Sequence, residues 1–239
     1  MAGHSKWANI KHRKEKADAK KGKIFSRVTK EIISAVKQGG ADVKTNPKLR
    51  LALQRAKEVN LPNDNVERNI KKAASADQAD FVEMVYELYG YGGVGILAEV
   101  MTDNKNRISS EMRIATNKRG GTLANPGAVS FNFERKGVLQ ITDKKTEEED
   151  LFLLATEAGA EDFEKVEGGF IITTLPEQLY EVKEKLEKQG IVFDEVALER
   201  VPKNYVECTE ELKKANGALI EWIESLEDVD LVFHNMKEE

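Results

Sequence analysis

The sequence predicts an α+β protein of several domains: an N-terminal three-helix bundle plus two α+β domains, one ferredoxin-like and inserted in the other. Apolar residues recur at helical spacing in the first third of the chain, and strand-like runs begin only after Asp80. Residues 134–204 show a β-α-β-β-α-β order, which is typical of ferredoxin-like domains. The last helix and strand are too few to form their own sheet, so we expect them to complete the sheet that begins at residue 81.

Three short amphipathic helices joined by tight loops are predicted between residues 24 and 79. The first ends at Gly39-Gly40, the second begins at Asn46-Pro47, and Pro62 opens the third. Residues 73–80 are expected to form a linker. The residues expected to face inward are Phe25, Val28, Ile32, Val36, Leu49, Leu53, Ala56, Val66, Ile70 and Ala74.

The middle of the chain is predicted to pair strands around a glycine-rich turn. Strands are expected over residues 81–90, 94–101 and 128–135, with a helix over residues 106–120. Gly90, Gly92 and Gly95 match the G-x-G-x-x-G pattern of dinucleotide-binding proteins, but that site needs a helix directly after the glycines. A strand-like run follows here, so we interpret the glycines as a connection between strands.

The predicted domains are a basic arm, a helical bundle, a discontinuous α+β domain and an inserted ferredoxin-like domain. In the inserted domain we expect strands at 137–142, 161–167, 169–175 and 192–201, and helices at 147–159 and 176–190. A helix at 209–226 and a strand at 228–235 end the chain. The domain boundaries are 1–23, 24–79, 80–133 plus 205–239, and 134–204.

The charge of the chain is divided very unevenly along the sequence. Residues 1–72 hold 19 Lys and Arg against 7 Asp and Glu, whereas residues 73–239 hold 18 against 35, and the whole chain carries −5. Eight of the first 23 residues are Lys or Arg. Such a concentration of like charge is stabilised by a bound polyanion, and phosphates supply that charge with release of counterions. We therefore predict a basic module for nucleic acid carried on an acidic body.

The predicted nucleic-acid contacts lie in the arm, in the first helix and around the helix near residue 106. In the arm, Trp7 and His12 offer flat faces for stacking on bases. The helix near residue 106 holds every Lys and Arg between residues 73 and 133, and its start resembles a phosphate cradle. The proposed contacts are His4, Ser5, Lys6, Trp7, Lys11, His12, Arg13, Lys14, Lys20, Lys21, Lys23, Arg27, Lys30, Asn104, Lys105, Arg107, Lys118 and Arg119. In the simpler alternative, the arm is a solvated surface with Trp7 packed on the bundle, and the helix is an ordinary polar one.

Several functional classes are disfavoured by the residues themselves. One cysteine, Cys208, excludes a disulfide framework, and no apolar run is long enough to span a bilayer. We find no competent catalytic constellation and no metal-ligand set, so we expect a binding protein, not an enzyme, with no cofactor and no small-molecule substrate. The basic start also resembles a mitochondrial targeting segment, but Glu15 and Asp18 interrupt it and serine is scarce. We expect a cytoplasmic protein and a monomer.

Several long motifs closely resemble the YebC family of transcriptional regulatory proteins. They are MAGHSKWANIKHRK at the start, DAKKGKIFSR, NPKLR, YELYGYGGVGILAE at residues 86–99, TDNKNR at 102–107 and NKRGG at 117–121. The resemblance implies three domains, one inserted in another, and a bacterial DNA-binding regulator of transcription. The family is also related to a mitochondrial translational activator of cytochrome oxidase. Because the opening motif begins at Met1, we expect no presequence.

Two functions follow from the resemblance and the charge, and the sequence alone does not decide between them. In the first, the protein regulates transcription by binding DNA through the arm and the helical domain. In the second, it is a translation factor whose arm reaches ribosomal RNA near the site of peptide synthesis, including at proline-rich stretches. An extended basic tip with one aromatic residue suits packed RNA as well as it suits a DNA groove. No helix-turn-helix signature supports reading of base sequence.

Overall fold

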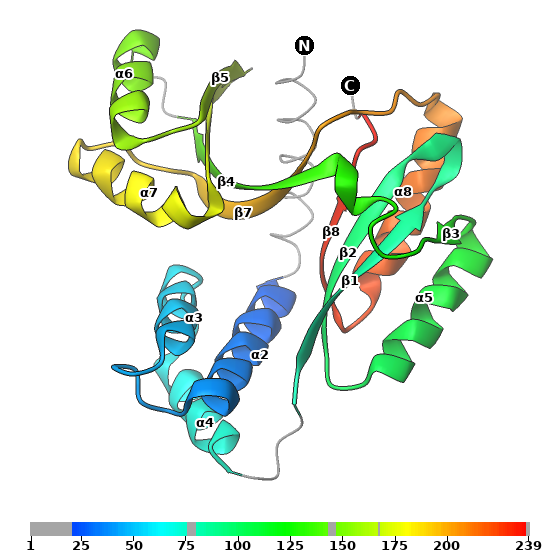
Figure 1. Ribbon diagram of the computed structural model, residues 1–239, viewed down its shortest axis with the longest axis horizontal. Coiled ribbons are helices and arrows are strands. Elements are labelled where there is room, and N and C mark those ends of the chain that lie inside the picture. Colours follow the sequence, from blue (N-terminus) through cyan, green and yellow to red (C-terminus); the bar gives the residue numbers. More distant parts are fainter. Residues whose placement is uncertain (1–20, 76–79, 143–146, 167, 238–239) are drawn as a thin grey trace. The chain divides into compact units, whose positions relative to one another are not determined.

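The structure is a computed structural model that describes residues 21–75, 80–142, 147–166 and 168–237 (Figure 1). The described residues form two compact units, one of residues 21–128 and 209–234, the other of residues 129–208 and 235–237. Helices and two antiparallel sheets are both present, which confirms the α+β class. Within the described ranges, no helix is long and apolar enough to cross a membrane.

The first unit begins with the three predicted helices, α2 (Lys21–Gly39), α3 (Pro47–Glu58) and α4 (Asn63–Ala73). Asn46 caps α3 by accepting a hydrogen bond from the Leu49 amide at 3.0 Å, and its side-chain amide donates to the Ala35 carbonyl at 2.7 Å. This buried asparagine therefore joins the end of α2 to the start of α3. The inward residues are as predicted with one exception, because Ala73 is buried and Ala74 is exposed.

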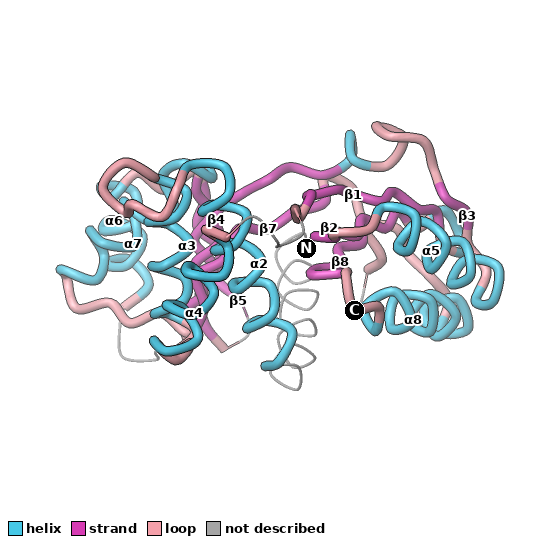
Figure 2. Tube along the Cα trace, turned by 90° about the horizontal axis from the view of Figure 1, so that it is seen from below, coloured by secondary structure: helices cyan, strands magenta, loops and turns pink. Residues whose placement is uncertain are grey.

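The same unit contains a four-stranded sheet with the order β3-β1-β2-β8. Its elements are β1 (Val82–Tyr89), β2 (Gly95–Thr102), α5 (Lys105–Arg119), β3 (Thr122–Leu123), α8 (Glu210–Ser225) and β8 (Val229–His234). β8 pairs with β2, so two segments far apart in the chain build one sheet. Helices α5 and α8 lie side by side on one face of this sheet (Figures 1 and 2).

The glycine-rich segment connects two antiparallel strands, as the sequence predicted. Tyr89 at the end of β1 pairs with Gly95 at the start of β2, with the short 3-10 helix η1 (Tyr91–Gly93) between them. Buried Asn216 of α8 accepts a hydrogen bond from the Tyr91 amide at 2.8 Å and donates to the Tyr91 carbonyl at 3.1 Å. A Cβ on Gly90 would lie 2.3 Å from the Asn216 Oδ1, so this glycine makes room for the contact.

The second unit contains the predicted strand and helix order. Its elements are η2 (Ser130–Asn132), β4 (Phe133–Ile141), α6 (Glu148–Ala158), β5 (Asp162–Val166), β6 (Gly169–Thr174), η3 (Pro176–Gln178), α7 (Leu179–Lys188) and β7 (Glu195–Pro202). The antiparallel sheet order β5-β6-β4-β7 is that of a ferredoxin-like domain. Helices α6 and α7 pack on one face, with Leu139, Ile141 and Ile172 of the sheet in the shared core.

One predicted strand boundary in this unit is wrong. We expected separate strands at residues 128–135 and 137–142, but residues 130–132 form η2 and a single strand runs from Phe133 to Ile141. Gly137 does not interrupt that strand. A Cβ on Gly137 would lie 2.8 Å from the Leu179 Cβ and 2.3 Å from the Thr174 Oγ1. The glycine therefore allows α7 to approach the sheet closely.

Candidate nucleic-acid interface

Half of the predicted nucleic-acid contacts lie outside the described residues. These are His4, Ser5, Lys6, Trp7, Lys11, His12, Arg13, Lys14 and Lys20. Lys21 is the first residue of α2, but its side chain is not among those described. The arm therefore stays a prediction from sequence, and the structure bears on the remaining eight residues.

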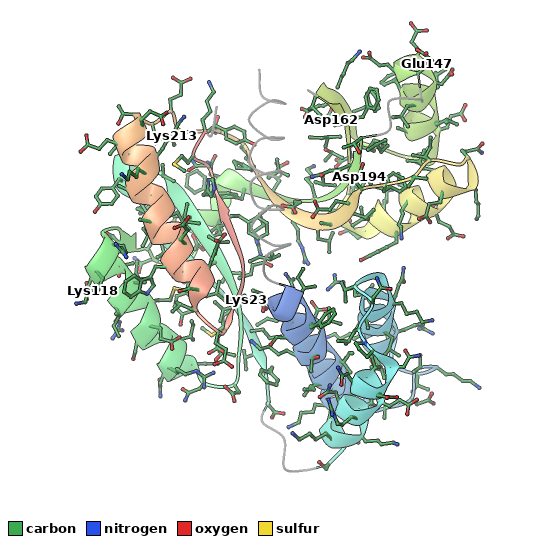
Figure 3. The ribbon with its side chains drawn as sticks, turned by 180° about the vertical axis from the view of Figure 1, so that it is seen from behind. Lys23, Lys118, Glu147, Asp162, Asp194 and Lys213 are labelled. Carbon is green, nitrogen blue, oxygen red and sulfur yellow. The ribbon has the colours of Figure 1, made fainter. Side chains whose placement is uncertain are left out.

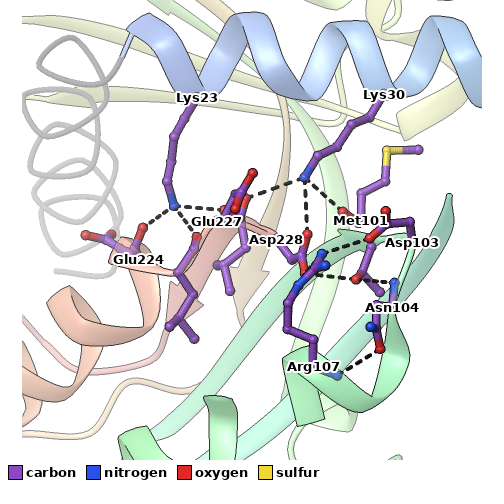
Figure 4. A network of polar contacts seen from close by, with 12 residues as sticks. Lys23, Lys30, Met101, Asp103, Asn104, Arg107, Glu224, Glu227 and Asp228 are labelled. Carbon is purple, nitrogen blue, oxygen red and sulfur yellow. Dashed lines mark hydrogen bonds and ion pairs between the residues drawn. The ribbon is translucent and has the colours of Figure 1, made fainter. Parts of the chain in front are cut away.

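Lys23 of α2 is directed at the end of another helix. Its Nζ donates hydrogen bonds to the backbone carbonyls of Glu224, of Leu226 at 2.6 Å and of Val229 at 3.2 Å (Figure 4). The Glu224 and Leu226 carbonyls lie where α8 ends, and Val229 is the first residue of β8. Carbonyls at a helix C-terminus lack partners within the helix and carry partial negative charge. Lys23 thus serves as a cap for α8, and we leave it out of the phosphate contacts.

Lys30 of α2 is buried in a polar network with the sheet of the same unit. Its side chain is 10% exposed, and its Nζ lies 2.9 Å from the Met101 carbonyl and 3.8 Å from the Asp228 carboxylate (Figure 4). Burying an ammonium group is costly unless hydrogen bonds and a countercharge surround it, and both are present here. Lys30 therefore attaches α2 to the sheet and is not open to a phosphate.

Arg27 is engaged in ion pairs on the same side of α2. Its Nε donates to the Glu31 carboxylate at 3.1 Å, and its Nη2 lies 3.8 Å from the Glu99 carboxylate of β2. Arg55 of α3 donates to the same Glu31 carboxylate at 2.9 Å. The three predicted α2 contacts whose side chains are described, Lys23, Arg27 and Lys30, therefore have partners inside the unit.

Arg107 of α5 closes the polar network around Asp228. Its guanidinium donates to Asp228 at 2.7 Å and to Asp103 at 2.8 Å, and these hydrogen bonds raise the pKa of the Arg107 side chain above its usual range. Thr102 also donates to the Asp228 carboxylate, at 2.9 Å. Asp228 is 3% exposed and is thus the shared countercharge of Lys30 and Arg107.

The start of α5 is less open to a phosphate than its sequence suggests. Asn104 caps the helix, because its Oδ1 accepts hydrogen bonds from the amides of Asn106 at 3.1 Å and Arg107 at 3.0 Å. Two of the amides that a phosphate would use are therefore already occupied by the cap. Asn104 is better explained as a helix cap than as a phosphate contact.

Apart from Arg107, α5 keeps positive charge at the surface, at Lys105 in its first turn and at its C-terminal end. Lys105, Lys118 and Arg119 are exposed, and Figure 3 shows Lys118 at the end of the helix. The Arg119 guanidinium lies 5.1 Å from the centre of the Trp222 ring of α8, so the ring holds this cation in place while it stays exposed. Arg113 on the same helix is also exposed.

A group of exposed cations on α3 and α4 was not among the predicted contacts. The sequence could have indicated these cations, because the charged residues on the polar faces of α3 and α4 are mainly Lys and Arg. Arg50 and Lys57 are seven residues apart and lie on the same face of α3. Together with Lys71 and Lys72 of α4 they are exposed, and no ion pair joins these four to a carboxylate among the described residues.

Asp230 of β8 gives this unit a pH-dependent stability. Burial raises the pKa of its carboxyl to about 6, against opposing contributions from Arg27 and Lys30. The Asp230 carboxyl therefore binds its proton more tightly in the folded state than in the unfolded state. Its contribution to the free energy of unfolding is complete below about pH 4 and is lost as the pH rises through about 6. At pH 7.5 we expect Asp230→Asn to raise the free energy of unfolding by on the order of 2 kcal/mol.

Urea denaturation at several pH values tests this expectation. The difference between Asp230→Asn and the unchanged chain should shrink towards zero as the pH falls from 7.5 to about 4. Asp64→Asn, which removes an exposed carboxylate on α4, is the matched control. A difference for Asp230→Asn that stays constant over this range would contradict the titration of Asp230.

The comparisons with known proteins agree with one another over most of the chain. Residues 5–76 match the family described as the TACO1/YebC protein N-terminal domain, and residues 81–236 match the TACO1/YebC second and third domain. A probable transcriptional regulatory protein of Protochlamydia amoebophila is 69% identical over 99% of this chain and 97% of that protein. Its counterpart in Chlamydia pneumoniae is 58% identical over 99% of this chain and 100% of that protein.

A solved structure also resembles the fold. The crystal structure of a conserved hypothetical protein from Aquifex aeolicus matches with a TM-score of 0.78 and 42% sequence identity. The match covers 92% of this chain and 91% of that chain.

Proposed function

Because this chain belongs to the TACO1/YebC family, we propose that it is a regulator of transcription that binds DNA through its basic arm and helical domain. The observation that carries the proposal is the charge division, with +12 in residues 1–72 and −17 in residues 73–239. Its relatives are named probable transcriptional regulatory proteins, which supports a regulatory role. We further propose that the protein acts as a monomer in the bacterial cytoplasm, binds no small-molecule substrate and catalyses no reaction.

The proposed footprint consists of the cations that the chain does not use internally. It comprises the arm and three groups of exposed side chains, on α3, on α4 and on α5. Such contacts bind phosphates and give affinity without base specificity, since phosphates carry no sequence information. Outside the arm, the footprint consists of Arg50, Lys57, Lys71, Lys72, Lys105, Arg113, Lys118 and Arg119.

A second candidate function is translation, with ribosomal RNA as the polyanion. The composition of the arm favours it, because a basic segment with Trp7 at its tip and His12 further along suits stacking in packed RNA. His4, Ser5 and Lys6 beside Trp7 would then contact functional RNA.

Competition between the two polyanions tests which function is correct. The full chain is mixed with ribosomes and a generic DNA duplex at about 150 mM salt, and bound protein is followed by sucrose-gradient sedimentation. DNA regulation predicts that the duplex holds the protein away from the ribosome, and the translation role predicts the reverse. A chain that begins at Lys21 serves as the control, because it keeps Lys23 and the cap of α8. DNA binding that disappears at this salt concentration would count against the DNA proposal.

A further inference from the structure

One end of the α+β part of the first unit is built from segments that contain no Asp or Glu. These segments are residues 88–98, 112–128 and 212–220. They meet in the structure, because a Cβ on Gly121 would lie 2.8 Å from the Leu219 side chain and 3.0 Å from the Tyr89 carbonyl oxygen. Since the three segments carry cations and no carboxylates, an anionic ligand is attracted to this end of an otherwise acidic body.

Arg119 offers a planar, positively charged group at this end. Its guanidinium lies 5.1 Å from the centre of the Trp222 ring, and the side chain is nevertheless exposed. A guanidinium is planar and delocalised, so it stacks on an aromatic ring with one face and leaves the other face to a nucleobase. The contact with Trp222 also restricts the Arg119 side chain before a ligand binds, which lowers the entropic cost of stacking.

Tyr91 presents an aromatic ring next to Arg119. The ring is 39% exposed, and its hydroxyl end occupies the space that a side chain on Gly120 would need. The backbone of Tyr91 is held on both sides by buried Asn216, which accepts from its amide at 2.8 Å and donates to its carbonyl at 3.1 Å. The Tyr91 ring is therefore exposed and fixed in position, as a stacking surface for a base requires.

The surrounding charge indicates which ligand these planar groups suit. Arg113 and Lys118 are exposed on the last two turns of α5 and can bind the phosphates on either side of a stacked base. A base inside a duplex is covered by its neighbours, so it reaches an aromatic ring or a guanidinium only when it is unpaired. An acidic peptide would meet the same cations but would gain little from the exposed planes. The ligand that uses both features is single-stranded nucleic acid.

We propose that Tyr91 and Arg119, with Arg119 supported by Trp222, form a stacking site for an unpaired base of single-stranded nucleic acid. The site rests on the proposed function, because it requires that the protein binds nucleic acid, and it adds the form of nucleic acid that is bound. The arm and the exposed cations hold phosphates of any strand. The stacking site selects segments whose bases are unpaired.

Fluorescence anisotropy of the full chain with labelled probes tests this selection. The probes are a single-stranded DNA of about 12 nucleotides, the RNA of the same sequence, the matching DNA duplex and a strand of equal length without bases. Arg119→Lys keeps the charge but removes the planar group, and Tyr91→Leu removes the ring. Each variant should weaken binding of single-stranded DNA or RNA roughly tenfold and change duplex binding by less than about twofold. Tyr91→Phe keeps the ring and is the matched control, with affinity equal to that of the unchanged chain.

The four probes separate the possible outcomes. Equal losses on single strands and duplex, or a loss that persists on the strand without bases, would show phosphate contacts only and would overturn the site. Unchanged single-strand affinity in a chain that binds duplex DNA would also overturn it, while the proposed function would stand. A selective loss on RNA in a chain that does not bind the duplex would support the site and contradict DNA regulation. The single strand with the larger loss identifies DNA or RNA as the source of the base.

Photochemical cross-linking of the unchanged chain tests the same contact without a substitution. A single strand that carries 5-iodouracil forms covalent links with aromatic side chains in contact with the base, and mass spectrometry identifies the linked residue. We expect a link to Tyr91. A link to Trp7 in the arm would show that the strand is bound and serves as the internal positive control. Links to Trp7 without any link to Tyr91 would overturn the stacking site.

Discussion

The Asp228→Ala variant is expected to lose about 3–5 kcal/mol of the free energy of unfolding. The Asp228 carboxylate is 3% exposed and accepts hydrogen bonds from Arg107 at 2.7 Å and from Thr102 at 2.9 Å. The ammonium of Lys30 lies 3.8 Å away and is itself buried. Removal of the carboxylate leaves a buried cation without its countercharge, and this costs more than the lost hydrogen bonds alone. The free energy of unfolding of most single domains is only about 5–15 kcal/mol, so this loss is severe.

Urea denaturation followed by circular dichroism measures the Asp228 effect. Asp103→Ala is the matched control, because Asp103 also pairs with Arg107 at 2.8 Å but its side chain is 34% exposed. An exposed ion pair contributes about 0–1 kcal/mol, so this variant should unfold close to the unchanged chain. Similar losses in the two variants would mean that burial does not determine how much each ion pair contributes to the free energy of unfolding. Lys30→Met, which removes the buried cation, should recover part of the stability of Asp228→Ala.

Replacement of Lys11, Arg13 and Lys14 by alanine is expected to weaken nucleic-acid binding roughly 10²- to 10³-fold near 0.1 M salt. Each phosphate contact releases counterions, and the logarithm of the binding constant falls with the logarithm of the salt concentration in proportion to the number of contacts. The loss of three contacts should therefore flatten this slope by up to about three units. The effect should appear with whichever polyanion the competition experiment selects.

Fluorescence anisotropy with a labelled duplex and a labelled RNA, from about 50 to about 200 mM salt, measures the slope. The control replaces Lys183, Lys185 and Lys188 of α7 with alanine, which removes the same charge from a helix that we assign no nucleic-acid contact. This control should leave the slope unchanged. If the arm variant keeps the original slope, the three residues do not contact phosphates. If both variants flatten it equally, only the net charge of the protein matters.

The local patterns of the sequence determined which elements form. Helical spacing of apolar residues predicted α2, α3 and α4, and the β-α-β-β-α-β order predicted a sheet whose strand order is ferredoxin-like. The strand-like run after Gly95 correctly predicted that the glycines connect two strands. The expected break between residues 135 and 137 was wrong, because a glycine in the sequence does not show whether it breaks a strand or admits a neighbouring helix.

The sequence by itself determined the secondary structure, the charge division and the family, since each depends on residue types and their local spacing. Only the tertiary structure decided which cations remain at the surface. Lys30 and Lys57 are both lysines on amphipathic helices, yet Lys30 meets a carbonyl 71 residues away while Lys57 stays exposed. A lysine has a long apolar stem, so it is stable either in water or buried against carbonyls and a carboxylate. Partners that are distant in the chain decide between these two states, and they come together only when the chain folds.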